Sequence, residues 1–187
     1  MKNKLDHPEV IPECFVDTNL IQTLVHGTVN HQHGCNNVIG SLNNTFKDRF
    51  AIGIIDLDRV QHRKNNFFSQ CSMIAKTSHL TLFKHNSRSQ YLITINPAID
   101  KFILDNAAEN KISLEKYDLP TDFKNFLSES KQNTSNLDSR FTKLFWGMKD
   151  VPEMRSLQAT LQYLITNNYK ATAETAKRYF VGELDSH

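Results

Sequence analysis

Three aspartates stand where short apolar segments of the chain end. The run at 50–55 is followed by Asp56 and Asp58, and the run at 14–16 is followed by Asp17. A short, β-branched run bounded by charge predicts a strand that is buried on both faces and central in a parallel sheet. Ligand sites in open α/β sheets lie beyond the carboxyl ends of strands, and Mg²⁺ and Mn²⁺ prefer oxygen ligands. We therefore expect Asp17, Asp56 and Asp58 to be catalytic residues that hold one divalent cation, Mg²⁺ or Mn²⁺.

These three aspartates would have different roles. We expect Asp56 to bind the cation directly, Asp58 to be a ligand or to support one, and Asp17 to be a further ligand or the general acid/base. A cation held there would activate a water and stabilise the charge that develops on a phosphoryl group. An aspartate after a strand also serves as a helix cap or turn residue, so a purely structural role is the alternative for each.

Two basic clusters accompany the acidic residues. One directly follows Asp58, and the other follows a strand expected at 80–83. If the strands are parallel neighbours, both clusters emerge near the same sheet edge as the acids, where cations would contact the phosphates of a nucleic acid. The alternative is an ordinary solvated loop. The cations expected to contact phosphates are Arg59, Arg63, Lys64, Lys84 and Arg88.

The loop at 27–36 carries further groups that could do chemistry. His31, His33 and Cys35 have the residue types of a zinc site, but a fourth ligand would have to come from elsewhere in the fold. A polar loop near the active site is the preferred interpretation, in which a histidine contacts phosphate or transfers a proton. The chain contains neither a GxGxxG nor a GxxxxGK[ST] nucleotide-binding motif.

Composition indicates a cytoplasmic globular protein. The chain has 187 residues, 39% of them hydrophobic, and a formal net charge of +2, with a mean hydropathy of −0.48. No apolar run approaches the roughly 20 residues that span a bilayer, and the first residues lack the apolar region of a signal peptide. Three cysteines without a CxxC pair fit a reducing compartment.

The residue pattern predicts one α/β domain over 1–187. Its core covers about 10–105, and a mostly helical extension covers about 106–187. The expected strands are 10–16, in which Pro12 suggests that pairing begins after it, 50–55 and 80–83. The segment 91–95 is either a fourth strand or an extended lead into the next helix. The helical spacing of apolar residues predicts helices at 18–26, 37–46, 98–108, 123–127, 140–148, 151–167 and 171–180.

The segment 10–60 resembles the TOPRIM domain, the catalytic module of topoisomerases, DnaG-type primases and OLD-family nucleases. Phe15-Val16-Asp17 resembles its first acidic motif, the segment 33–38 resembles its Gly-containing loop, and Ile54-Ile55-Asp56-Leu57-Asp58 resembles its DxD motif. The segment 91–102 is loosely similar to the OLD-like branch, where an acidic residue precedes a helix. The resemblance implies a TOPRIM-like central parallel sheet flanked by helices. It also implies a metal-dependent nuclease acting on DNA or RNA.

The OLD-like branch implies a biological setting as well. It suggests an effector in a bacterial or phage defence system that works with an ATPase or sensor protein. Separately, the apolar residues of the helical half could form an interface with a second copy, and the lack of a long apolar run predicts no membrane association.

The chain departs from the TOPRIM pattern at its first acid. The family has a glutamate, usually followed by glycine, whereas this chain has Asp17 followed by Thr18. Aspartate is one methylene shorter, and Glu13 would lie inside the strand on the expected register. This departure supports a second hypothesis, a non-catalytic TOPRIM-like interaction subunit of a larger complex.

The segment Phe15-Val16-Asp17-Thr18-Asn19-Leu20-Ile21 also resembles the opening motif of PIN-domain ribonucleases. PIN domains need further acids on the helices that follow, and 18–47 contains no Asp or Glu. A PIN-like ribonuclease is the third hypothesis.

Overall fold

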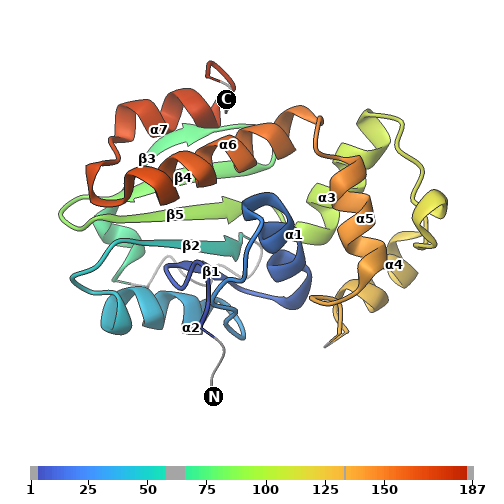
Figure 1. Ribbon diagram of the computed structural model, residues 1–187, viewed down its shortest axis with the longest axis horizontal. Helices are drawn as coiled ribbons and strands as arrows, with labels where there is room; N and C mark the ends of the chain where they lie inside the picture. The colour runs from blue at the N-terminus through green and yellow to red at the C-terminus, as the bar shows by residue number, and fades with distance from the viewer. Residues whose placement is uncertain (1–3, 58–65, 133, 185–187) are drawn as a thin grey trace.

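A five-stranded mixed sheet forms the centre of the protein (Figure 1). The computed structural model describes residues 4–57, 66–132 and 134–184. The strands lie in the order β1-β2-β5-β4-β3. Their bounds are Val10–Pro12 for β1, Ala51–Asp56 for β2, Cys71–Lys76 for β3, Leu80–His85 for β4 and Gln90–Ile95 for β5.

The three strands β1, β2 and β5 run parallel. Pro12 pairs with Ile54, and Asp56 pairs with Ile95. All six residues of β2 are buried, as predicted from its unbroken apolar run. The prediction that this segment is a buried strand parallel to the first one is confirmed, and Asp56 is its last residue.

The other two strands are antiparallel to their neighbours. β4 pairs with β5 and β3 pairs with β4, both in the antiparallel sense. The edge strand β3 was not expected, because its polar and mixed sequence leaves Ser72 and Met73 exposed and shows no clean alternation. The sheet is therefore mixed, and the expectation of a wholly parallel sheet is wrong for this half.

Seven α-helices are described, at positions close to those predicted. Their bounds are Phe15–Val25 for α1, Cys35–Gly40 for α2, Ile99–Glu109 for α3, Phe123–Ser130 for α4, Ser139–Gly147 for α5, Pro152–Asn167 for α6 and Ala173–Phe180 for α7. A short π-helix, Ser41–Thr45, directly follows α2 and completes the helical crossing from β1 to β2.

The sheet separates two apolar clusters because successive residues of a strand face opposite sides. Ile52 and Ile54 belong to the larger cluster, whereas Ala51 and Ile55 belong to the smaller one, shared with α2. Gly53 lies where α2 comes close to the sheet. A Cβ there would lie 2.9 Å from Leu42 Cδ1 of the π-helix and 3.1 Å from Val38 Cγ1 of α2, so glycine leaves room for the close approach.

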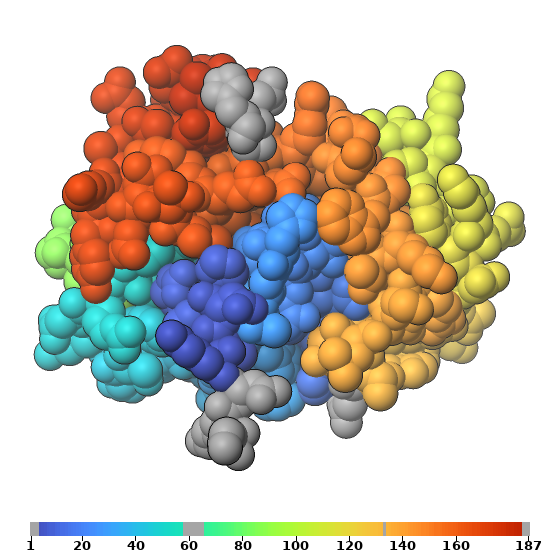
Figure 2. Space-filling model, viewed as in Figure 1, coloured from blue at the N-terminus to red at the C-terminus, as the bar shows by residue number. Residues whose placement is uncertain are grey.

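The second half of the chain packs against the first rather than standing apart. Helix α7 contacts β3 and β4, and α1 contacts both α5 and α6. Figure 1 shows α6 and α7 covering the sheet, with α3, α4 and α5 beyond the ends to which β2 and β5 point. In Figure 2 the orange C-terminal helices lie directly against the blue N-terminal segments. One continuous core includes residues from both halves.

Within the described residues, no helix has the length and apolar character needed to cross a membrane.

Candidate active site

A pocket of about 360 Å³ opens beyond the carboxyl ends of the parallel strands. Three carboxylates from three successive parallel strands line it. Glu13 directly follows β1, Asp56 ends β2, and Asp100 lies in the first turn of α3 after β5. Their side chains belong to residues that are only 1%, 4% and 6% exposed. The expectation that acidic strand ends meet at one sheet edge holds for Asp56, with Glu13 and Asp100 as its neighbours.

Glu13 takes the position that was expected for Asp17. Strand β1 ends at Pro12, so Glu13 follows the strand instead of lying inside it. Its Oε2 accepts a hydrogen bond from the backbone N–H of Asp56 at 3.0 Å. This bond continues the contact between β1 and β2 for one residue beyond their paired backbones.

Asp17 lies in the first turn of α1 rather than at a strand end. It forms a capping box with Cys14: the Asp17 carboxylate accepts from the Cys14 N–H at 3.1 Å, and Cys14 Sγ accepts from the Asp17 N–H at 3.5 Å. The prediction of a strand over 10–16 that ends in Asp17 is therefore wrong. Capping by Cys14 starts the helix at Phe15, before the apolar run ends.

Asp17 is fully buried, and this burial changes its acidity. Its Oδ1 has no hydrogen-bond partner among the described residues. Burial raises the pKa of Asp17 to about 7. Hydrogen bonds from Cys14 act in the opposite direction, while the negative charges of Glu13 and Asp100 raise the pKa further. Asp17 is absent from the described residues that line the pocket.

Asp56 and Asp100 connect β2 to the start of α3. The Oδ1 atom of Asp56 accepts a hydrogen bond from the Ile99 N–H at 2.9 Å, so Asp56 satisfies one of the free donors at the start of this helix. The hydroxyl of Ser130, from the end of α4, donates to Asp100 Oδ1. Asp100 lies five residues after the end of β5, whereas Asp56 is the last residue of β2, so a search confined to strand ends does not find Asp100.

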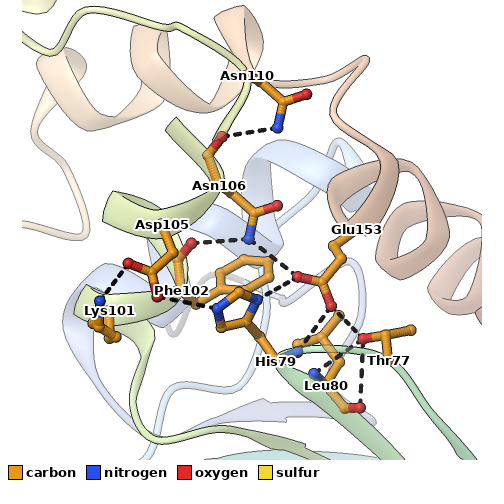
Figure 3. Close-up of polar contacts among 9 residues, drawn as sticks. All are labelled: Thr77, His79, Leu80, Lys101, Phe102, Asp105, Asn106, Asn110 and Glu153. Atoms are coloured by element: carbon orange, nitrogen blue, oxygen red, sulfur yellow. Dashed lines mark hydrogen bonds and ion pairs between the residues drawn. The ribbon is translucent and has the colours of Figure 1, made fainter. Parts of the chain in front are cut away.

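A polar network outside the pocket holds α3 in place (Figure 3). His79, in the turn before β4, contacts Glu153 of α6 through Nδ1 at 2.6 Å and Asp105 of α3 through Nε2 at 3.2 Å. Glu153 also accepts hydrogen bonds from Thr77 Oγ1, from the His79 backbone N–H and from Asn106 Nδ2. The network therefore joins this turn, α3 and α6 at one point.

This network also shifts the acidity of its members. Burial lowers the pKa of His79, but hydrogen bonds to Glu153 and Asp105 outweigh burial and leave the pKa raised. Burial raises the pKa of Glu153, and its hydrogen bonds, led by that from Thr77, leave it lowered.

The histidine loop forms another wall of the pocket. It runs along β1, with Asn30 N–H donating to Val10 O at 2.9 Å, and Gly34 N–H donating to Glu13 O at 3.1 Å. Gly34 has φ +87°, and α2 begins at the next residue. His31 and His33 both line the pocket, as expected for a polar loop near the active site.

The predicted phosphate-contacting cations do not gather at the pocket. Asp58, Arg59, Arg63 and Lys64 lie outside the described residues. Lys84 pairs with Tyr91, which also pairs with Ile52 near the start of β2. The acids are at the other end of the strands: Asp56 lies four residues beyond Ile52, which is about 13 Å along the strand.

Lys84 and Arg88 are instead bound within the fold. The Lys84 ammonium donates to the backbone oxygen of His85 at 2.7 Å and to that of Arg88, and Arg88 Nη1 donates to Asn43 Oδ1 at 3.1 Å. Their predicted place beside the acids is wrong because β4 runs antiparallel to β5. Lys131, at the end of α4, is the cation among the described residues that line the pocket.

The donor set suits a hard divalent cation that keeps part of its hydration shell. Among the described residues, no group of three or more His, Cys, Asp or Glu side chains is placed to hold a metal ion. Mg²⁺ is commonly bound through only one or two carboxylates, with waters and substrate phosphates completing its shell. Glu13, Asp56 and Asp100 are the residues that could hold such an ion in the pocket.

Comparison of the chain with protein-family models, with curated proteins and with solved structures finds no match.

Proposed function

We propose that this protein is a metal-dependent nuclease that hydrolyses phosphodiester bonds in DNA or RNA. The observation that carries the proposal is the convergence of Glu13, Asp56 and Asp100 on one pocket at the carboxyl ends of parallel strands. Buried carboxylates repel one another unless a cation or a proton compensates their charge. A divalent cation that binds together with the substrate would reduce this repulsion.

In this proposal, the pocket side chains bind the cation and the substrate, and backbone hydrogen bonds position the carboxylates. One or two of the pocket carboxylates would hold Mg²⁺ or Mn²⁺, with waters and substrate phosphates completing its shell, and the cation when bound would supply charge stabilisation to the reacting phosphoryl group. The exposed Lys131 contacts a phosphate that flanks the scissile bond. The hydrogen bonds from Asp56 N–H to Glu13 and from Ile99 N–H to Asp56 fix the carboxylates before substrate enters.

The TOPRIM resemblance supports the same function. Because Glu13 follows β1 and Asp56 ends the neighbouring β2, we propose that Glu13 takes the role that the resemblance assigned to Asp17. A role in a bacterial or phage defence system, with an ATPase or sensor partner, stays a prediction from the resemblance.

Conservative variants test this function without removing the structural hydrogen bonds. In Glu13→Gln, Asp56→Asn and Asp100→Asn, a carbonyl oxygen remains as an acceptor while the negative charge is lost. We expect each variant to keep its melting temperature within a few degrees, to bind Mn²⁺ more weakly by calorimetry, and to lose at least about a hundredfold in cleavage. Substrates should include supercoiled plasmid, single-stranded DNA and tRNA. Asp150→Asn, at an exposed position, is the matched control.

One observation favours the second hypothesis, a non-catalytic interaction subunit. Glu13 and Asp56 each accept a backbone hydrogen bond, so both have a structural role without any metal. A wild-type protein that neither binds Mn²⁺ nor cleaves the three substrates would support this alternative.

A further inference from the structure

His31 is a pocket residue whose ring is fixed in one orientation. Phe15 stacks on one face of the imidazole, with 4.5 Å between ring centroids and an angle of 26°. His33 packs edge-on against the ring at 4.6 Å. His31 shares the pocket with Glu13 and Asp56.

The neighbours of His31 determine which ring nitrogen carries the proton. The Nδ1 atom lies 2.7 Å from Thr18 Oγ1. The single hydroxyl proton of Thr18 is directed to the backbone oxygen of Cys14, at 2.7 Å, and this oxygen can only accept. Thr18 must therefore accept from His31, which places the proton on Nδ1. In the neutral ring, Nε2 then carries the lone pair.

The Nε2 atom has no hydrogen-bond partner among the described residues, and it is buried. Burial lowers the pKa of His31, and the nearby His33 lowers it further. The neutral ring is therefore the main form at pH 7. A buried lone pair that accepts no hydrogen bond is energetically costly. No described residue donates to Nε2, so a water or a substrate group would fit as its donor.

We propose that His31 is the general base of the active site, taking a proton through Nε2 from the water that attacks the phosphodiester. This role rests on the proposed function. A neutral imidazole with one tautomer fixed by a hydroxyl, facing the same pocket as the substrate-binding carboxylates, has the features of a proton acceptor.

The step conserves atoms and charge. An O–H bond of the water breaks, and its proton forms a bond with the lone pair of Nε2. The water oxygen forms a bond to phosphorus while the bond from phosphorus to the leaving oxygen breaks. The leaving oxygen keeps that electron pair and takes a proton from solvent, and the imidazolium of His31 returns its proton to solvent.

The titratable groups around His31 also affect its acidity, so the pH dependence must be read against them. The groups that line the same pocket are Glu13, Cys14, His33, Asp56, Asp100 and Lys131.

The test compares His31→Asn with the wild type. Asparagine places an amide N–H near the position of Nδ1, so the bond to Thr18 is retained, while Nε2 and the ring that packs on Phe15 are lost. We expect kcat to fall by about 10² to 10⁴ in Mn²⁺, the rise of the rate with pH on the acidic side to disappear, and added imidazole to restore part of the activity. His26→Asn is the matched control, because asparagine tolerates the left-handed conformation of this residue (φ 55°).

A second readout does not depend on activity. Long-range proton–nitrogen NMR spectra identify the protonated nitrogen, and the signals lost in His31→Asn belong to His31. We expect the proton on Nδ1. A proton on Nε2, or a His31→Asn variant with wild-type kcat and an unchanged pH profile, overturns the role of His31 while leaving the proposed function intact. A wild-type protein that cleaves none of the substrates removes the proposed function and the general base together.

Discussion

Glu13 Oε2 accepts the backbone N–H of Asp56 at 3.0 Å, which joins the residue after β1 to the last residue of β2. Both residues are almost fully buried. The two carboxylates are thus positioned by the ends of neighbouring parallel strands and by this bond. A change in Glu13 affects both the local fold and the chemistry of the pocket, and the two effects can be separated.

Replacing Glu13 by alanine should destabilise the protein by about 1–3 kcal/mol, because the buried N–H of Asp56 loses its acceptor. Glu13→Gln keeps an acceptor oxygen and should cost less than about 1 kcal/mol. Urea denaturation at pH 7 measures both free energies of unfolding. Equal losses in the two variants would show that the charge of Glu13, rather than its hydrogen bond, stabilises the fold.

Asp17 should make the stability of the protein fall as the pH rises. Its pKa is about 7 in the folded protein and 3.8 as the ordinary value, so the folded state favours the protonated carboxyl. The resulting stabilisation is complete below pH 3.8 and is lost as the pH rises to about 7. The interval corresponds to at most about 4 kcal/mol.

Asp17→Asn should remove this dependence, because the amide does not ionise in this range. Free energies of unfolding should be measured from about pH 4.5 to about pH 8.5, which brackets the expected titration. The stability of Asp17→Asn relative to the wild type should increase as the pH rises. Parallel curves for the two proteins would contradict the raised pKa of Asp17. Asp150→Asn, at an exposed position, should follow the wild type.

Glu153→Gln should destabilise the protein by about 2 kcal/mol, because the carboxylate accepts hydrogen bonds from Thr77, His79 and Asn106. The pKa of Glu153 is lowered from 4.5 and that of His79 is raised from 6.5. The contribution of Glu153 is lost as the pH falls below 4.5, and that of His79 is lost as the pH rises through its folded pKa.

The difference in the free energy of unfolding between the wild type and Glu153→Gln should therefore be largest between pH 4.5 and pH 6.5 and smaller in alkaline solution. Urea denaturation over this range measures the difference, with the exposed Glu115→Gln as the matched control. A difference that stays constant into alkaline solution would show that His79 contributes nothing through its charge.

Lys131→Ala should weaken the binding of nucleic acid and reduce the slope of log affinity against log salt by about 1, because one phosphate contact is lost. Arg88→Ala should leave both quantities near their wild-type values, since Arg88 lies at the opposite end of the strands and contacts Asn43. Fluorescence anisotropy with a labelled single-stranded oligonucleotide, in buffer containing Ca²⁺, measures the affinity and its dependence on salt concentration. A loss confined to Arg88→Ala would place the nucleic acid on the other edge of the sheet.

The residue pattern alone determined the local elements that depend on nearby residues. The buried strand at Ala51–Asp56 follows from its unbroken apolar run, and the long helix Pro152–Asn167 follows from its 3.6-residue apolar spacing and its initial proline. Placing Asp56 at the carboxyl end of a central parallel strand needed no further information.

Only the tertiary structure decided which groups join Asp56 in the pocket. A side-chain cap from Cys14 moved the start of α1 ahead of Asp17 and left Glu13 at the strand end. The antiparallel direction of β4 carried Lys84 to the far edge of the sheet. The connection between β4 and β5 spans only residues 86–89, which is too short for the crossover that parallel strands need, so the two strands run antiparallel. The meeting of Asp100 with Ser130 depends on how α3 and α4 pack, which no sequence spacing expresses.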